Sequence, residues 1–214
     1  MDPGLRRDDE VAGMTQIDFI FAIGSRYSYL AHRQLDGIAR DHGVSFRWRP
    51  VTSIALMRQA RGGTSPFDGP PPAKQYDFTW RKQDAEAWAE LYGIPFRDPH
   101  HRLKYDSAKA NHACVAADRL GRGEAYARAL FPEIFVADNP SLDRDDYIAL
   151  GEKLGIDGFA AALDDPQTAA TAQAIQDEAV ARGSFGVPTF LIDDRIFWGN
   201  DRLVLLRHYL AGRA

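Results

Sequence analysis

Three stretches that lie far apart in the sequence carry residues that could do chemistry together. Ser25 lies in a polar break, Val187-Pro188 comes directly before an apolar run, and Asn200-Asp201 stand near the C-terminus. A hydroxyl can donate a hydrogen bond to an anion such as a thiolate. A peptide unit exposed beside a proline can pair with an extended ligand, and a carboxylate can hold an ammonium group. These groups make one site only if the fold brings them together.

The elements around Ser25 form the first half of the expected fold. Residues 17–23 alternate and are rich in β-formers, which predicts a buried strand. Apolar residues recur at helical spacing over 29–42, and Gly43 is typical of a helix C-cap. Residues 44–49 alternate again as a second strand, which Pro50 ends. This order is β-α-β, the unit in which a crossover helix joins parallel strands.

The C-terminal part of the chain predicts the second half. Residues 189–192 are typical of a strand, 193–195 of a tight turn and 196–198 of the returning hairpin strand. A break at 199–201 precedes a closing helix over 202–210. The order of elements here is therefore β-β-α.

The long segment between the two halves is predicted to be helical and free of strands. A loop rich in Gly, Pro and Ser covers 62–72. The whole segment is too long for a connection, so it should pack as a small subdomain. Helices are expected at 54–60, 76–92, 107–120, 124–137, 157–163 and 166–182, with an Asp-rich helix start near 141–143.

Together these patterns predict an α/β fold, a thioredoxin-like β-α-β / β-β-α core with an all-helical insertion subdomain. The core would comprise residues 17–60 and 183–214, and the insertion residues 61–182. Residues 1–16 are expected to form a disordered or ragged tail. Strands and helices do not simply alternate, and no Gly-x-Gly-x-x-Gly run follows the first strand, which argues against a Rossmann sheet.

In a thioredoxin-like core the first helix begins where the first strand ends, which places Ser25 at the helix start. A helix N-terminus offers unpaired N–H groups and a partial positive charge, so it stabilises anions, thiolates included. Ser25 therefore stands where a redox enzyme would carry its reactive cysteine, and its hydroxyl can hold the thiolate of a ligand. The alternative is that Ser25 serves only as the N-cap of the helix.

Val187-Pro188 is the candidate binding corner opposite that helix start. We interpret it as a cis corner whose Val187 backbone pairs with an extended peptide. The alternative is a trans proline that opens an edge strand. A ligand with both a peptide backbone and a thiol would satisfy both places, and glutathione is that ligand. Asn200-Asp201 would supply a counter-charge for its ammonium group, or merely cap the last helix.

Composition and charge narrow the possible partners. The 214 residues have a net charge of −4, with 45% hydrophobic and 26% charged residues, which gives no electrostatic case for nucleic acid or an anionic membrane. No apolar run approaches the about 20 residues that cross a bilayer, and no secretory signal is expected. Cys114 is the only cysteine, which excludes a Cys-x-x-Cys pair and favours a cytoplasmic location. The neighbouring His100-His101 lack further ligands at metal spacing, so no metal site is expected.

Four motifs occur in order along most of the chain: residues 25–31 (SRYSYLA), 91–95 (LYGIP), 185–190 (FGVPTF) and 197–202 (FWGNDR). As a set they resemble the 2-hydroxychromene-2-carboxylate isomerase family, kin to the kappa-class glutathione transferases and more distantly to disulfide oxidases. The resemblance implies a glutathione-dependent isomerase of a small aromatic-derived carboxylate, in aromatic-hydrocarbon catabolism, in which the glutathione thiolate adds to the substrate and later leaves. A kappa-class-like transferase or peroxidase and a non-catalytic peptide- or thiol-binding module are the alternatives. A homodimer is possible.

The resemblance also implies roles for individual residues. Ser25 would hold the glutathione thiol, Val187 before Pro188 would pair with the cysteinyl backbone, and Asn200 with Asp201 would hold the γ-glutamyl end. The family usually has proline after the serine. Arg26 stands there in this chain, beside Tyr27, and adds a cation that could lower the thiol pKa or bind a substrate carboxylate. A family lysine that reaches toward glutathione would be Lys74 or Lys82, unless both are surface charges.

Overall fold

The computed structural model describes residues 14–99, 106–137 and 141–213. Most of the tail expected over residues 1–16, as well as His100 and His101, therefore lies outside the described residues. The tail boundary itself was wrong by two positions, because Thr15 and Gln16 already belong to the first strand. They pair with Val44 and Ser45 of the neighbouring strand, which gives them backbone partners that a tail would lack.

The sheet has four strands in the order β2-β1-β3-β4. β1 runs parallel to β2 and antiparallel to β3, and β4 returns antiparallel beside β3 as the predicted hairpin. All four residues of β3 are buried, as are the last five of β1, so these two strands form the centre of the sheet. The strands are β1 (Thr15–Phe21), β2 (Val44–Pro50), β3 (Thr189–Ile192) and β4 (Arg195–Trp198).

The helices follow the predicted order, and the main correction concerns the first of them. The single helix expected over 29–42 begins three residues earlier, directly after Ser25, and is divided near Arg33 into two helices. Gly43 ends the second with φ 63°, as its residue type predicts. The helices are α1 (Arg26–His32), α2 (Leu35–His42), α3 (Ser53–Ala60), η1 (Lys74–Tyr76), α4 (Phe78–Tyr92), α5 (Ser107–Arg119), α6 (Gly123–Phe135), α7 (Arg144–Lys153), α8 (Phe159–Asp164), α9 (Pro166–Ala181), η2 (Asn200–Arg202) and α10 (Leu203–Ala211).

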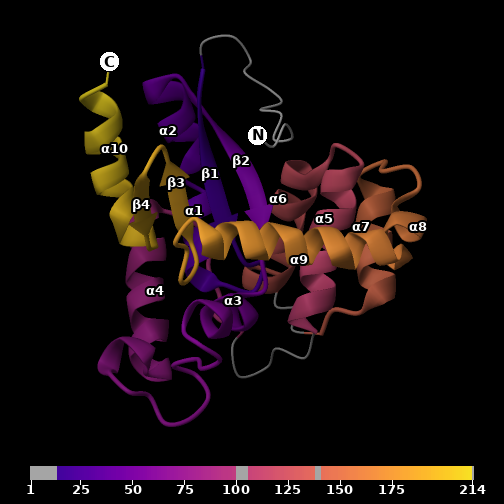
Figure 1. Cartoon of the computed structure of the whole chain (residues 1–214), viewed down its shortest axis with the longest axis horizontal. Coiled ribbons are helices and arrows are strands. Elements are labelled where there is room, and N and C mark those ends of the chain that lie inside the picture. The colour runs from indigo at the N-terminus through magenta and orange to yellow at the C-terminus, as the bar shows by residue number, and fades with distance from the viewer. Residues whose placement is uncertain (1–13, 100–105, 138–140, 214) are drawn as a thin grey trace, which may run out of the picture.

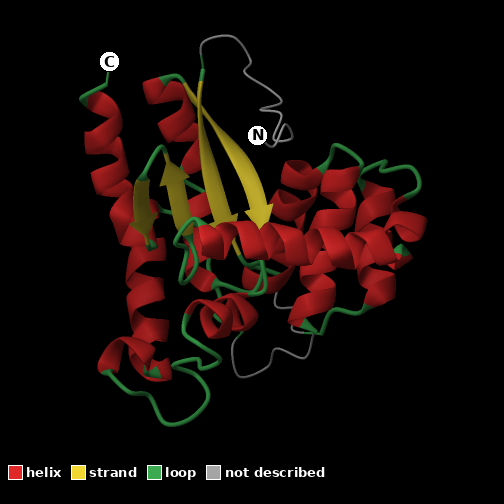
Figure 2. Ribbon diagram, in the orientation of Figure 1, coloured by secondary structure: helices red, strands yellow, loops and turns green. Residues whose placement is uncertain are grey.

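Helices cover both faces of the sheet, and α5 to α8 gather at one side of it (Figure 1). The long helix α9 crosses the front of the sheet and leads back to β3, as the ribbon in Figure 2 shows. One buried apolar cluster runs from Phe19 and Phe190 in the sheet to Tyr126 and Phe159 in the helical segment. The predicted thioredoxin-like core with helices inserted between its halves is confirmed. The exact domain boundaries stay a prediction. None of the helices in the described ranges is long and apolar enough to span a membrane.

A buried carboxylate ties α9 to the sheet. Asp18 of β1 accepts hydrogen bonds from Arg47 of β2, with Nη2 to Oδ2 at 2.9 Å, and from Arg182 just after α9. Burial alone would raise the pKa of Asp18, but the two guanidinium groups outweigh it and hold that pKa below its usual value. The ionised form is therefore the one that the fold requires.

The α1–α2 break carries a buried histidine. The ring of His32 stacks on Phe131, with centroids 4.6 Å apart, and its Nδ1 lies 2.5 Å from the Tyr29 carbonyl oxygen. That contact requires Nδ1 to carry the proton and donate it. Burial lowers the pKa of His32 to about 3, so the ring stays neutral in the folded protein at neutral pH.

We predict that acidification destabilises the protein through His32. The pKa of this residue is lower in the folded than in the unfolded chain, so the unfolded chain binds the proton more readily and stability falls as pH drops below about 6.5. The free energy of unfolding should decline with a contribution of up to about 1.4 kcal/mol per pH unit from this group. Urea denaturation between about pH 6.5 and 4.5 measures it, above the range where Asp18 titrates.

The variant His32→Phe should flatten this dependence, because it keeps an aromatic ring on Phe131 and cannot take up a proton. The exposed His208, changed to Asn, is the matched control and should leave the slope unchanged. Parallel pH curves for the wild type and His32→Phe would contradict the prediction.

Candidate functional site

Ser25 begins α1 directly after the end of β1. Its backbone N–H donates to the Ala22 carbonyl at 2.9 Å, and its Oγ accepts the Ser28 N–H at 3.2 Å. With φ −90° and ψ 117°, Ser25 is the N-cap of α1. Capping uses an oxygen lone pair and leaves the hydroxyl proton free to donate. The cap therefore does not exclude the binding role.

The Val187-Pro188 peptide bond is cis, as interpreted from the sequence. Pro188 is buried and its carbonyl accepts the Gly199 N–H at 2.9 Å, which fixes the corner against the residue that follows β4. Within the described part of the chain, the N–H and C=O of Val187 pair with no other group. A peptide unit without partners in an ordered corner is available to a ligand.

Strand register brings these two segments to the same end of the sheet. Ile20 of β1 lies opposite Thr189 of β3 in an antiparallel pair. Ala22, whose carbonyl accepts the Ser25 N–H, comes two residues after Ile20, and Val187 comes two residues before Thr189, so both leave the sheet at the same end. η2 also packs against α1. The three sequence stretches that carry candidate functional groups therefore meet around the start of α1.

Asn200 and Asp201 occupy different environments within η2. The Asn200 side chain is buried, and its Oδ1 accepts a hydrogen bond from the Tyr92 hydroxyl at 3.1 Å. Its Nδ2 is buried and has no hydrogen-bond partner among the described residues. The Asp201 side chain is half exposed and lies 3.6 Å from the neighbouring Arg202. Tyr92 is an additional residue of this region that sequence reasoning did not assign.

Arg26 is buried, although the sequence suggested an accessible cation. Its Nη1 lies 2.7 Å from Oδ2 of Asp98, and its guanidinium lies 5.2 Å from the centre of the Phe78 ring. Burial lowers the pKa of Arg26, and the Asp98 carboxylate opposes that shift. The positive charge is taken up by an internal ion pair, and this geometry lends no support to a direct role in binding a substrate carboxylate.

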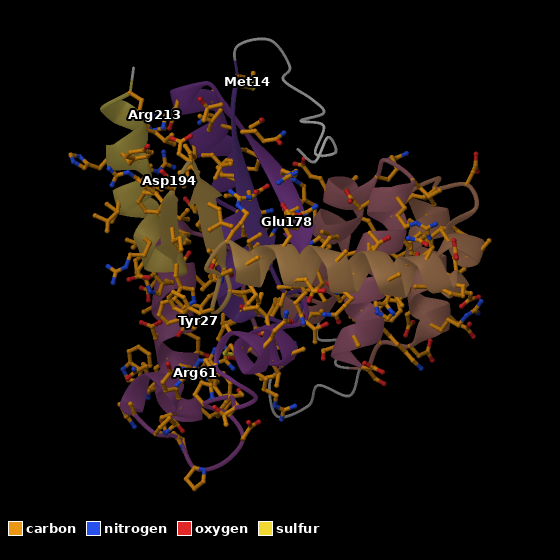
Figure 3. All side chains as sticks on the ribbon, in the orientation of Figure 1. Met14, Tyr27, Arg61, Glu178, Asp194 and Arg213 are labelled. Atoms are coloured by element: carbon orange, nitrogen blue, oxygen red, sulfur yellow. The ribbon has the colours of Figure 1, made fainter. Side chains whose placement is uncertain are left out.

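Tyr27, labelled in Figure 3, lies beside α4: its hydroxyl donates to Oδ2 of Asp84 at 2.8 Å. Burial, and then the Asp84 carboxylate, raise the pKa of Tyr27, so its hydroxyl keeps the proton. The guanidinium of Arg81 lies 5.5 Å from the Tyr27 ring centre. Tyr27 thus joins α1 to α4 through both its hydroxyl and its ring.

The two candidate lysines are engaged by acids in their own segments. Nζ of Lys74 lies 3.0 Å from Oδ1 of Asp77, and Nζ of Lys82 lies 2.5 Å from Oε1 of Glu86. Both ammonium groups are exposed to solvent. This arrangement favours the surface-charge alternative, and a contact of either lysine with glutathione stays a prediction.

The long-range partners Asp84 and Asp98 had no signal in the sequence, because each lies in a segment whose placement depends on how the helices pack. Trp198 is a further residue of this region to which the sequence assigned no role. This ring is 40% exposed and packs against the 44% exposed Phe185, with centroids 4.8 Å apart, beside the cis corner. Gly186 makes the contact possible, since a Cβ there would lie 2.5 Å from the indole nitrogen.

Comparison with known proteins identifies the family to which this fold belongs. The family model of the DSBA-like thioredoxin domain matches residues 16–211. A solved structure of 2-hydroxychromene-2-carboxylate isomerase aligns with a TM-score of 0.77 and 29% identity, covering 92% of this chain and 94% of that one. A probable DsbA oxidoreductase from Streptomyces coelicolor shares the fold at 20% identity and a TM-score of 0.68, covering 92% and 89%. The fold and site define a DSBA-like thioredoxin domain.

Relatives that are similar in sequence identify the family more narrowly. A 2-hydroxychromene-2-carboxylate isomerase of Pseudomonas sp. (strain C18) is 32% identical over 92% of this chain and 90% of its own length. One of Sphingobium xenophagum is 30% identical over 91% and 97%. The chain belongs to the 2-hydroxychromene-2-carboxylate isomerase family, which confirms the resemblance seen in the four motifs. These relatives support an isomerase built on the DSBA-like fold. The single cysteine, Cys114, is buried, and burial raises its pKa far above the usual value, which suits a structural thiol.

We predict that the Arg26–Asp98 pair is a main support of the site. Asp98→Asn removes the anion and leaves a buried guanidinium without its counter-charge. The free energy of unfolding should therefore fall by about 3–5 kcal/mol, measured by urea denaturation. Replacing both residues, as Arg26→Met with Asp98→Leu, should recover most of that loss, because no buried charge remains.

The matched control is Asp164→Asn, which breaks the exposed ion pair with Arg144 at 2.5 Å. An exposed pair is screened by solvent and contributes little to stability, so this change should cost far less than Asp98→Asn. Equal small losses at Asp98 and Asp164 would contradict the assigned importance of the buried pair.

Proposed function

We propose that the protein is a glutathione-dependent isomerase of a small aromatic-derived carboxylate, of the 2-hydroxychromene-2-carboxylate type. One observation carries this proposal: the Ser25 hydroxyl, with its proton available to donate, and the Val187 peptide, which has no partner among the described residues, lie at the same end of the sheet. The names of the relatives support the isomerase part. The dependence on glutathione rests on the fit of the residues.

The residues present fit glutathione at three points. Ser25 offers a hydrogen-bond donor at a helix start, which suits a thiolate. The free N–H and C=O of Val187 suit the cysteinyl backbone, which can pair as an added strand. At the γ-glutamyl end, Nδ2 of Asn200 is a buried donor without a described partner, and the exposed Asp201 carboxylate suits an ammonium group.

The contribution of Ser25 is to favour the thiolate over the thiol. Its Oγ already accepts the Ser28 N–H, so its own proton is directed to another acceptor. That donor and the partial positive charge of the α1 N-terminus both lower the pKa of a thiol placed there. Arg26 strengthens neither effect directly, because Asp98 neutralises its charge.

When bound, glutathione supplies a thiolate that adds reversibly to the conjugated substrate, so that a former double bond can rotate before the thiol leaves. The chain itself orients and stabilises. Ser25 holds the sulfur in its charged form, and the Val187 peptide sets the direction of the cysteinyl residue. The aromatic pair Phe185 and Trp198 borders the corner and supplies an apolar rim.

We predict that Ser25→Ala lowers glutathione-dependent turnover of 2-hydroxychromene-2-carboxylate by about 10²–10³-fold, the loss typical of one preorganised donor. The pKa of the bound thiol, followed by the ultraviolet absorbance of its thiolate, should rise. Ser25→Ala also removes the N-cap, at a cost of about 1 kcal/mol of stability.

Ser25→Asp separates the two roles, because aspartate caps the helix but offers no proton at neutral pH. It should restore stability and leave turnover low. Unchanged turnover in Ser25→Ala would refute this mechanism. A wild type that conjugates aromatic halides or reduces peroxides but does not isomerise would instead be a transferase or peroxidase. Binding of extended peptides without glutathione would favour a non-catalytic module.

A further inference from the structure

Arg81 of α4 is an accessible cation that lies beside Tyr27, in the first turn of α1. Its side chain is partly exposed, and no carboxylate of the described residues lies within ion-pair distance of it. Arg26, by contrast, is buried against Asp98. Asp84, one turn further along α4, accepts its hydrogen bond from Tyr27 and not from Arg81.

Two aromatic rings hold the Arg81 guanidinium in place. Its central carbon lies 5.5 Å from the ring centre of Tyr27, two residues after Ser25, and 4.8 Å from that of Phe67. Cations are attracted to the faces of aromatic rings, and a guanidinium that meets rings with its flat side keeps its N–H groups at the edge. Those N–H groups form a fork that matches a carboxylate.

The loop that carries Phe67 is itself ordered by local contacts. The Phe67 N–H donates to Oγ of Ser65 at 3.2 Å, and the Ser65 N–H donates to Oδ2 of Asp68 at 2.7 Å. Arg58 of α3 pairs with Asp68 at 2.6 Å, and the Phe67 ring meets the edge of Tyr76. Arg81 thus contacts one ring from α1 and one ring from an anchored loop. A cation fixed in this way loses little further side-chain freedom when it binds an anion.

We propose that Arg81 binds the carboxylate of the substrate and is a specificity-determining residue. This inference rests on the proposed function, since it names the substrate group that the same site recognises. The rings of Tyr27 and Phe67 lie next to the guanidinium and place aromatic side chains beside that group. An aromatic-derived carboxylate offers the matching charge and the matching flat apolar body.

The test compares Arg81→Gln and Arg81→Lys with the wild type, using 2-hydroxychromene-2-carboxylate as substrate. Loss of a charge-assisted fork should raise KM for the substrate by about 10- to 100-fold in Arg81→Gln, while KM for glutathione stays unchanged. Arg81→Lys should fall between, because an ammonium keeps the charge but not the fork. Arg61→Gln, which removes an exposed arginine at the end of α3, is the control and should match the wild type.

An active wild type whose KM for the substrate is unchanged by Arg81→Gln overturns this inference and leaves the proposed function standing. A wild type that is inactive, or active without glutathione, overturns the proposed function. In that case equilibrium binding of salicylate, followed by tryptophan fluorescence, decides about Arg81. Saturable binding that is lost in Arg81→Gln, with no binding of the neutral salicylamide, supports the carboxylate site. Absence of that pattern overturns it.

Discussion

The antiparallel pairing of β1 with β3 is the constraint on which the site depends. It joins a strand near the beginning of the chain to one near its end, and its register sets Ile20 against Thr189. A shift by one residue would turn every side chain of β3 to the opposite face, and all four are buried. The packing of β3 in the core therefore also fixes where Val187 lies relative to the turn that contains Ser25.

Buried polar contacts then hold the helical segment against the thioredoxin-like core. Tyr27 reaches Asp84, Arg26 reaches Asp98, and Tyr92 reaches Asn200, each joining the segment around α4 to the thioredoxin-like core. On the other face, Asp18 gathers Arg47 and Arg182. Such contacts are directional, so they specify one placement of the segment where apolar packing alone would tolerate several.

Much of this architecture was predictable, because local rules govern it. Alternation placed β1 and β2, Gly43 marked the end of α2, and the proline beside Val187 indicated the cis corner. The start of α1 was set too late at Tyr29, since helical periodicity registers apolar residues only.

The partners of the polar first turn of α1 were not predicted, for a physical reason. Arg26 and Tyr27 are helical residues whose partners, Asp98 and Asp84, lie more than one element away in the sequence. Trp198 is partly exposed on β4, and strand alternation alone does not tell which face of an edge strand is covered. Ser25 could be identified from its position in the motif. No local sequence pattern could show that Arg81 would lie against Tyr27.

The presence of serine at the N-cap of α1 affects how the protein responds to oxidants. At the position where disulfide enzymes of the same fold carry a reactive cysteine, this chain has the hydroxyl of Ser25. Its only cysteine, Cys114, is buried. Oxidants would therefore find nothing to damage permanently at the helix start. Under the proposed function, oxidation would fall on the bound small-molecule thiol, and each exchange of that molecule would renew the reactive centre.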